Sequence, residues 1–231
     1  MDSQRPPPIT MIMAVRDSAR FIAEAVESLR NQSLPPAEII VVDDGSEDGS
    51  GEIARAAGGD IVRVIQQGRQ GLGVARKAGL AAAATPIVGF FDSDDVAPAD
   101  RLDALAQPFV REPGVAITSG HWCNFETTDH GIGDSPSGSG VIGDVHSEVM
   151  ITSSLYMRDA AMTNPPFEIG NDLHCDGLWV ADMLSRGLVH HQVDSIVLRR
   201  RIHDRNMSRL KTDADLLDFV FELKRRRQSK A

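Results

Sequence analysis

The sequence predicts an α/β protein in which a mostly parallel, Rossmann-like β-sheet carries helices on both faces. Two observations lead to this prediction. In the first half of the chain, short apolar runs alternate with helix-like segments, and parallel strands need such crossover helices. Three of the apolar runs end in polar loops that read "RDS", "DDGS" and "DSDD". Sheets of this class bind their ligands beyond the carboxyl ends of the strands, so these loops are expected to meet along one edge.

The first half supplies four strands and three helices. The predicted strands are residues 9–15, 38–42, 60–65 and 86–91, and the predicted helices are residues 18–32, 50–58 and 74–84. Within the first helix, apolar side chains recur at intervals of three and four residues, which is typical of an amphipathic helix. Asp17 or Ser18 is its expected N-cap. Before "DSDD", an apolar run follows Pro86, as expected of a buried strand.

The second half is less regular. The expected strands are residues 114–120, 148–157 and 196–203, and the expected helices are residues 104–110, 176–187 and 213–227. Gly187 is the expected end of the helix before the last strand. Residues 127–144 are rich in Gly, Ser and Asp and are expected to form a long loop.

Composition excludes several classes of protein. A net charge of −9, from 33 acidic and 24 basic side chains, argues against a general nucleic-acid-binding protein. Cys123 and Cys175 form no CxxC pattern, so neither a disulfide framework nor a structural zinc site is expected. The chain begins with no signal-peptide pattern, and no apolar run approaches the roughly 18 residues that span a bilayer. These features predict a cytoplasmic protein without a transmembrane segment.

The segment "DSDD", residues 92–95, raises the question of what balances its charge. Carboxylates this close repel one another, which would raise their pKa values or disorder the turn. A divalent cation would resolve the conflict. Mg²⁺ and Mn²⁺ bind one or two carboxylates and fill their remaining positions with water and phosphate oxygens. Taken alone, an acidic turn is also typical of a solvated surface or a helix cap.

The order and spacing of four segments strongly resemble the nucleotide-sugar-binding half of family 2 glycosyltransferases. The segments are the opening strand and helix "ITMIMAVRDSARF", then "VVDDGS", "GRQGLGVARKAG" and "DSDD". The resemblance covers roughly residues 1–100. It implies a GT-A fold, a nucleotide-diphosphate sugar donor and inversion at the anomeric carbon. Residues 1–231 would then form a single GT-A domain, with the acceptor-binding half and a C-terminal lid in residues 101–231.

The resemblance assigns donor contacts residue by residue. Asp44 takes the position that hydrogen-bonds the nucleobase, and a carboxylate can accept the imide N–H of uracil. Ala14 and Arg16 take positions that line the base and ribose, and Arg76 takes that of an arginine facing the nucleotide. The family usually has tyrosine and asparagine where this chain has Arg16 and Asp17. A guanidinium is therefore expected to stack on the base in place of the tyrosine.

The same resemblance assigns the metal site. Asp92 takes the first position of the DxD motif, near the ribose and metal-bound water, Ser93 is the neighbouring donor contact, and Asp94 takes the position of the direct metal ligand. The metal is expected to be Mn²⁺ or Mg²⁺. Near the C-terminus, "RRRIHDRNMSR" resembles a segment that returns to the diphosphate. His203 would there ligate the metal or touch the leaving group. The residues that would shape the lid are Arg201, Asn206 and Ser208.

Inverting transfer also needs a base for the acceptor's proton. Asp176, in "GNDLHCDGLW", takes the position of the family's catalytic aspartate. Cys175 replaces the glutamate that usually precedes it, so Asp172 remains an alternative base. Apart from the resemblance, an aspartate here is equally typical of a helix cap.

Two other functions remain open from the sequence. A sugar nucleotidyltransferase would also place carboxylates beside a sugar nucleotide, but it would show a glycine-rich phosphate loop near the N-terminus, and "AVRDSARF" is not one. A catalytically silent sugar-nucleotide-binding protein would not need the carboxylates and histidine described above. The expected donor is a UDP-sugar, and the acceptor is left open among glycans, peptides and small molecules.

Overall fold

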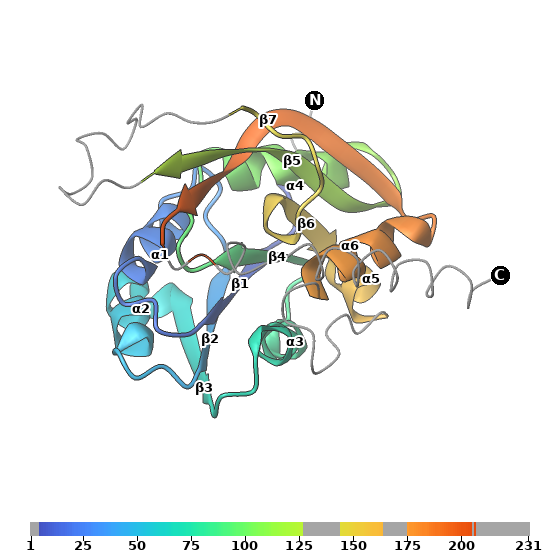
Figure 1. The fold of residues 1–231 in the computed structure, drawn as a ribbon. Helices are drawn as coiled ribbons and strands as arrows, with labels where there is room; N and C mark the ends of the chain where they lie inside the picture. Colours follow the sequence, from blue (N-terminus) through green and yellow to red (C-terminus); the bar gives the residue numbers. More distant parts are fainter. Residues whose placement is uncertain (1–4, 127–143, 164–174, 205, 207–231) are drawn as a thin grey trace, which may run out of the picture.

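The computed structural model describes residues 5–126, 144–163, 175–204 and 206 of the chain. Within these ranges the strands form one seven-stranded sheet in the order β3-β2-β1-β4-β6-β5-β7 (Figure 1). The strands are β1 (Ile9–Val15), β2 (Glu38–Asp44), β3 (Val62–Gln67), β4 (Ile87–Asp92), β5 (Val115–Glu126), β6 (Ser154–Met157) and β7 (Val189–Ile202). The helices are α1 (Ile22–Arg30), α2 (Ser50–Gly58), α3 (Leu72–Ala82), α4 (Arg101–Arg111), α5 (Arg158–Met162) and α6 (Cys175–Ser185), with 3-10 turns η1 (Gly59–Ile61) and η2 (Ile151–Ser153).

The sheet is mostly parallel, as predicted. β1 lies between β2 and β4 and is parallel to both, and β3 is parallel to β2. β6 pairs antiparallel with β4 on one side and with β5 on the other, and β5 is parallel to β7. One short antiparallel strand therefore joins the two parallel parts of the sheet.

Alternate side chains of the central strands pack against opposite helix layers. Met11 and Met13 of β1 pack with α1, α2 and α4, whereas Ile12 packs with α3 and α6. All three are fully buried, and burial of a side chain of this size stabilises a fold by about 1.5–3 kcal/mol. Gly79 lets α3 approach β1 closely, because a Cβ at this position would lie 2.4 Å from Cγ2 of Ile12. The central strands are thus held firmly between two layers.

Strand pairing brings the carboxyl ends of the first four strands to one edge of the sheet. Ala14 of β1 is aligned with Val42 of β2 and with Asp92 of β4. Two positions after Val42, Asp44 at the end of β2 is aligned with Gln67 at the end of β3. The polar loops that follow these strands therefore share one edge, as expected from the sequence.

The predicted cap of the first helix is wrong. α1 begins at Ile22, and no side chain caps its N-terminus. Ser18 lies instead in the loop before the helix, where its amide donates to Oγ of Ser50 at 2.8 Å and its Oγ lies 2.7 Å from Oγ of Ser93. The hydroxyl of Ser18 therefore contacts Ser93 in the turn after β4 and does not cap α1.

The second half differs more from expectation. β7 begins at Val189, several residues earlier than the predicted strand, because it pairs along the whole of β5. Residues 148–157 form η2 and then β6 rather than one strand. Gly187 has a left-handed φ of 72° after α6, as expected of a helix end. The predicted helix 213–227 and nearly all of the predicted loop 127–144 lie outside the described residues. Among the helices that are described, none has the length and apolar content needed to cross a membrane.

Candidate active site

A pocket of about 570 Å³ opens at the carboxyl ends of β1, β2 and β4. All the residues predicted to contact the donor, hold the metal or act as the base line it, namely Ala14, Arg16, Asp44, Arg76, Asp92, Ser93, Asp94, Asp176 and His203. Of the three predicted lid residues, Asn206 also lines it, Arg201 does not, and Ser208 lies outside the described residues. The other lining residues are Val15, Asp17, Ser18, Arg20, Phe21, Leu72, Ala75, Asp95, Met150, Arg200 and Asn206. The fold therefore brings both halves of the chain to one cavity.

Asp44 lines the pocket and is almost fully buried. Its Oδ1 accepts hydrogen bonds from Nε2 of Gln67 at 2.7 Å and from the amide of Gln70 at 2.8 Å, and its Oδ2 accepts one from the amide of Gly71 at 2.8 Å. The carboxylate thereby fixes the glycine-rich loop before α3 against the end of β2. Asp44 has a structural task in addition to its predicted contact with a nucleobase.

The loops after β1 and β2 are tied into one wall of the pocket. Asp17 has a left-handed φ of 50°, a conformation that aspartate tolerates better than most residues. Its amide donates to Oγ of Ser46 at 3.1 Å, and its carboxylate accepts from the amide of Glu47 at 3.0 Å. The carboxylate of Asp48 accepts from the amide of Ala19 at 2.8 Å. These contacts give Asp17, at which the chain departs from the family pattern, a part in shaping the wall.

Arg76 is a buried cation between two carboxylates. Its Nη2 donates to Oδ1 of Asp92 at 2.7 Å, and its Nη1 is paired with Oδ1 of Asp176. Its side chain is 2% exposed, against 40% for that of Asp92 and 33% for that of Asp176. The arginine predicted to face a nucleotide thus links the acidic turn after β4 to the first turn of α6.

The acidic turn gathers three carboxylates. Asp92, Asp94 and Asp95 each offer an oxygen within 4.8 Å of the others. Partial burial raises the pKa of Asp92 against the opposing charge of Arg76, and the charges of Asp94 and Asp176 raise it further. Burial raises the pKa of Asp95 well above its usual range, with further increases from Asp94 and Asp92. Both carboxyl groups therefore bind a proton more tightly than an exposed aspartate does.

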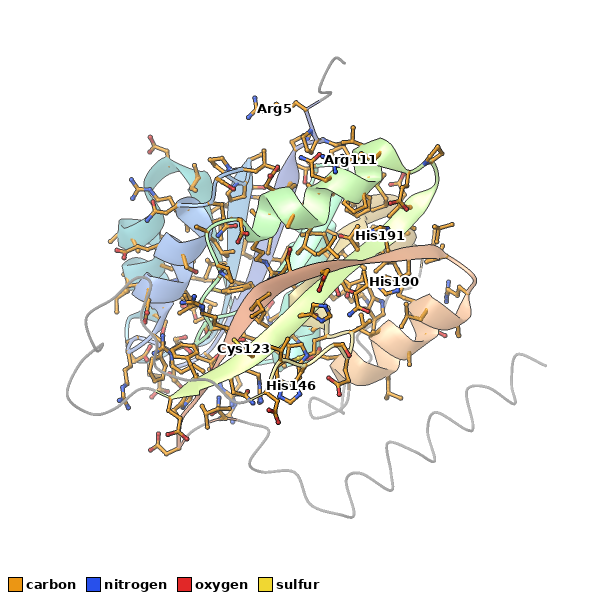
Figure 2. The ribbon with its side chains drawn as sticks, turned by 90° about the horizontal axis from the view of Figure 1, so that it is seen from above. Arg5, Arg111, Cys123, His146, His190 and His191 are labelled. Atoms are coloured by element: carbon orange, nitrogen blue, oxygen red, sulfur yellow. The ribbon has the colours of Figure 1, made fainter. Side chains whose placement is uncertain are left out.

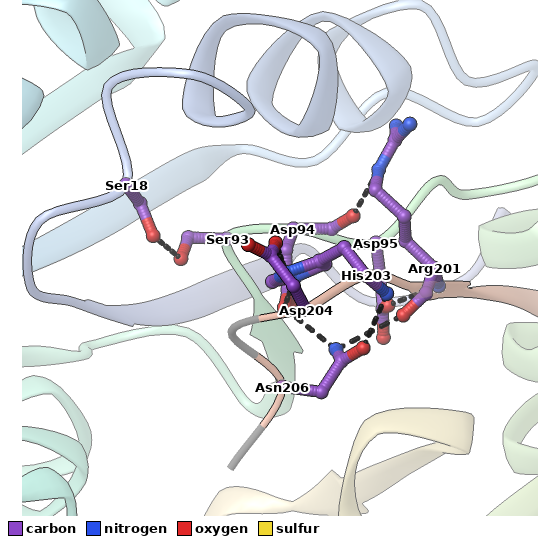
Figure 3. A network of polar contacts seen from close by, with 8 residues as sticks. All are labelled: Ser18, Ser93, Asp94, Asp95, Arg201, His203, Asp204 and Asn206. Atoms are coloured by element: carbon purple, nitrogen blue, oxygen red, sulfur yellow. Dashed lines mark hydrogen bonds and ion pairs between the residues drawn. The ribbon is translucent and has the colours of Figure 1, made fainter. Parts of the chain in front are cut away.

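The end of β7 closes on this turn (Figure 3). Nε2 of His203 lies 2.9 Å from Oδ2 of Asp94, and Nδ2 of Asn206 lies 3.4 Å from the same oxygen. The amide of Arg201 donates to Oδ1 of Asp95 at 2.9 Å, and its Nε donates to the carbonyl oxygen of Asp94 at 2.7 Å. The C-terminal segment thus holds the turn through both backbone and side chains.

Arg201 is held in turn by α1 and β5. Its side chain is 3% exposed and is ion-paired with Glu24 of α1. Its guanidinium lies 5.1 Å from the ring centroid of Phe21 and 4.5 Å from that of Phe125. Cation–π contacts and the ion pair both favour the charged side chain in this buried position. This arginine, itself part of β7, therefore connects α1 and β5 to the acidic turn.

Several other histidines lie away from this cluster. His190 and His191 belong to β7, and His146 lies near β5 (Figure 2). Burial lowers the pKa of His190, whose Nε2 is 2.8 Å from Oγ of Ser119. The ring of His146 stacks on Trp122 with centroids 4.0 Å apart. Each of these contacts is explained by packing along β5 and β7.

The family of the chain follows from comparison with known proteins. Residues 10–160, more than half of the chain, match the profile of Glycosyl transferase family 2. The chain belongs to this family. The match includes the strand ends, the glycine loop and the acidic turn that form most of the pocket. The family resemblance seen in the sequence is thus confirmed.

Curated relatives share the family over parts of their length. The chain is 36% identical over 121 residues to "Putative glycosyltransferase EpsH" of Bacillus subtilis, an alignment that covers 52% of this chain and 34% of the relative. It is 27% identical over 218 residues to "Uncharacterized glycosyltransferase YibD" of Escherichia coli, covering 87% of this chain and 63% of the relative. The chain therefore spans less than two thirds of the length of these relatives.

Solved structures show that this family 2 chain has a GT-A fold. TarS 1-349 of S. aureus, in complex with UDP-GlcNAc, superposes with a TM-score of 0.70 at 19% identity, covering 89% of this chain and 61% of TarS. The mannosyltransferase PcManGT of Pyrobaculum calidifontis, in complex with GDP-Man and Mn2+, gives a TM-score of 0.64 at 18% identity, covering 88% of this chain and 59% of that protein. At these identities the likeness establishes the fold alone.

Sequence reasoning did not assign several residues of this site. Asp95 is the third carboxylate of "DSDD", to which the family resemblance gives no role; it is buried and accepts a hydrogen bond from the amide of Arg201. Glu24 is a polar residue outside the apolar face of α1, and nothing in the neighbouring sequence indicates its contact with Arg201. Gln67 ends β3, and only the pairing of β2 with β3 places it beside Asp44. These contacts depend on tertiary structure.

The residues of the acidic turn suit a hard divalent cation. Carboxylate oxygens of Asp92, Asp94 and Asp95 lie together, and His203 adds an imidazole nitrogen next to Asp94. Such a donor set fits Mn²⁺ or Mg²⁺. The raised pKa values of Asp92 and Asp95 point in the same direction, because added positive charge would favour their ionised forms.

Proposed function

We propose that this chain is a metal-dependent, inverting glycosyltransferase that moves a sugar from a UDP-sugar to an acceptor hydroxyl, amine or thiol. One observation carries the proposal. A single pocket holds a recessed carboxylate at the strand ends (Asp44), an acidic turn fit for a divalent cation, and a separate carboxylate on α6 (Asp176). We also propose that residues 1–231 work as one domain, in which residues 1–100 bind the donor and residues 101–231 complete the acceptor side.

The donor would lie along the strand ends. The nucleobase would meet Asp44, and Ala14 and Arg16 would line the base and ribose, with the guanidinium of Arg16 stacked on the base. Asp92 and Ser93 would contact the ribose and the diphosphate end of the donor. This order follows the pocket wall from β2 to β4.

The metal would be held by Asp94 and His203, with Asp92 nearby. When bound, it would supply positive charge to the departing diphosphate. The hydrogen bonds from Arg201 and Asn206 would orient the turn and its ligands. Arg200, which also lines the pocket, would add positive charge on the same side.

Asp176 would act as the base. As the acceptor heteroatom forms its bond to the anomeric carbon, its proton passes to the Asp176 carboxylate. The bond from that carbon to the diphosphate oxygen breaks, and the electron pair leaves with the nucleoside diphosphate. Attack opposite the leaving group inverts the anomeric centre. Arg76 would position Asp176 through their ion pair. Asp172, the alternative base, lies outside the described residues.

A thermal-shift screen tests the proposal. The protein would be melted with UDP-sugars, GDP-mannose and the free nucleotides, each with Mn²⁺ or with EDTA. A ligand that binds the folded state raises the melting temperature by mass action, so a UDP-sugar should raise it with Mn²⁺ and much less with EDTA. Slow release of UDP from the stabilising sugar would distinguish an enzyme from a silent binding protein. No shift with any nucleotide sugar in Mn²⁺ would contradict the proposal.

A further inference from the structure

We infer that Gln67 restricts the nucleobase that the pocket accepts, because its side chain occupies an acceptor position on Asp44 that guanine would need. The inference rests on the proposed function, since it requires Asp44 to face the nucleobase. Gln67 is the last residue of β3 and is not part of the pocket wall. Its influence would therefore pass through Asp44.

Asp44 has little acceptor capacity left. An ionised carboxylate has two oxygens with about four lone-pair positions in all. Both positions on Oδ1 are used, by Nε2 of Gln67 and by the amide of Gln70, and one position on Oδ2 is used by the amide of Gly71. By this count a ligand can donate one further hydrogen bond to Asp44, and it has to do so at Oδ2.

The contact between Gln67 and Asp44 is built into the sheet. The two residues are aligned partners at the ends of neighbouring parallel strands. An ionised carboxylate cannot donate, so the carboxamide of Gln67 must turn its NH₂ group toward Asp44. The other two donors, at Gln70 and Gly71, are backbone amides that a side-chain substitution does not remove. Of these three hydrogen bonds, a side-chain substitution can remove only the one from Gln67.

Nucleobases differ in what they offer a carboxylate. Uracil presents one N–H, its imide, between two carbonyl groups. Guanine presents its ring N1–H and an amino N–H side by side, and such a pair binds a carboxylate through both of its oxygens. Because Oδ1 of Asp44 is already filled, one of the two guanine donors would be left unpaired in a buried position. A buried donor without a partner lowers affinity by about tenfold or more.

The experiment compares nucleotides across two matched variants. Binding of UDP and GDP would be measured by calorimetry in Mn²⁺ for the unaltered chain, for Gln67→Met and for Gln66→Met. Methionine keeps the length of glutamine but donates no hydrogen bond. Gln66 is the exposed neighbour of Gln67 on the same strand, and adjacent strand residues point to opposite faces. UDP methylated at the imide nitrogen serves as a further probe.

The unaltered chain should bind UDP at least about tenfold more tightly than GDP. Gln67→Met should lower the ratio of the GDP dissociation constant to the UDP dissociation constant by about threefold or more. Gln66→Met should leave this ratio unchanged. The methylated UDP should bind weakly to all three proteins. Equal affinity for UDP and GDP in the unaltered chain would overturn the inference, as would an equal change of both affinities in Gln67→Met. Failure of every nucleotide to bind a folded protein, as judged by circular dichroism, would remove the proposed function and this inference together.

Discussion

Arg76 shows how much one residue contributes to this pocket. A buried guanidinium is costly unless its charge is balanced, and here two carboxylates from distant parts of the chain balance it. Asp92 ends a central strand of the sheet, whereas Asp176 lies in the first turn of α6 on the face of the sheet. The shared arginine therefore fixes the proposed base relative to the acidic turn. Neither carboxylate could be positioned in this way by its own element alone.

Asp176→Asn tests the proposed base. Asparagine keeps the shape of the side chain and can accept a hydrogen bond from Arg76, but it does not take up a proton at neutral pH. General-base catalysis contributes typically about 10²- to 10⁴-fold, so kcat should fall by that order. Donor affinity should change little, whereas the melting temperature should fall, because the buried Arg76 loses one of the two charges that balance it. Steady-state kinetics with saturating donor, together with UDP titration, would measure both effects.

The exposed residue Asp159 supplies a control for that substitution. Its side chain is 98% exposed and it does not line the pocket, so Asp159→Asn should leave kcat unchanged. Activity retained in Asp176→Asn but lost in Asp172→Asn would move the base to Asp172. Activity retained in both variants would show that the acceptor needs no base from this protein.

Asp94→Ala tests the proposed metal ligand. The substitution removes a carboxylate that lies between His203 and the other acidic residues. Transfer should be abolished, and Mn²⁺ should no longer increase the affinity for UDP. Asp100→Ala is the matched control, because Asp100 follows the same turn, is exposed and does not line the pocket. Full activity of Asp94→Ala in Mn²⁺ would contradict the assignment.

At the scale of elements, local patterns predict the first half of the fold better than the second. β1, β2 and β4 are apolar runs that end at polar loops, and burial in a parallel sheet produces that pattern directly. The length of β7 depends on β5, a partner far away in sequence, so its exposed first residues give little local signal. The cap predicted at Ser18 failed for a similar reason, since its hydroxyl contacts Ser93 across the fold.

Glu24→Ala tests whether α1 supports the acidic turn. Glu24 pairs with the buried Arg201, which bonds the carbonyl of Asp94. Loss of a hydrogen bond to a charged group typically costs about 1.5–3 kcal/mol, so the free energy of unfolding should fall by about that amount. Mn²⁺ affinity should also fall, since the turn loses part of its support. Denaturant unfolding and metal titration would measure the two effects.

Glu27→Ala on the same helix is the control. Glu27 is exposed and does not line the pocket, so its removal should affect neither stability nor Mn²⁺ binding appreciably. If Glu24→Ala lowers stability but leaves Mn²⁺ affinity intact, then α1 contributes to the fold without positioning the metal site.

At the scale of the whole molecule, the sequence predicts which residues belong to the site better than it predicts the contacts between them. The spacing of "VVDDGS", the glycine loop and "DSDD" placed the assigned residues at one edge of a sheet, and all of them line one pocket. Their partners were not predictable. The link from Arg76 to Asp176 and the donors on Asp44 require segments to be brought together by strand order and helix packing. Sequence periodicity carries no information about such contacts.

The acidic turn also makes the stability of the molecule depend on pH. Burial and neighbouring carboxylates raise the pKa of Asp95 well above its usual value of 3.8, against the opposing amide of Arg201 and charge of Arg200. The pKa of Asp92 is also raised, against the charge of Arg76. A carboxyl with a higher pKa in the folded state binds its proton more tightly there. Its contribution to stability is therefore full at low pH and is lost as pH rises through the folded-state pKa.

Mn²⁺ should reverse this trend. The metal binds deprotonated carboxylates, so protons compete with it. Because the pKa values of Asp92 and Asp95 are raised, this competition extends to a higher pH than for an exposed aspartate. The increase in melting temperature caused by Mn²⁺, relative to EDTA, should therefore grow from pH about 5 to pH about 7.5. In Asp95→Asn, the melting temperature in EDTA should fall less as pH rises, because the substitution removes a carboxyl group whose pKa is raised in the folded state. Asp159→Asn should behave like the unaltered chain. An effect of Mn²⁺ that stays constant across this range would show that the cluster does not bind the metal in competition with protons.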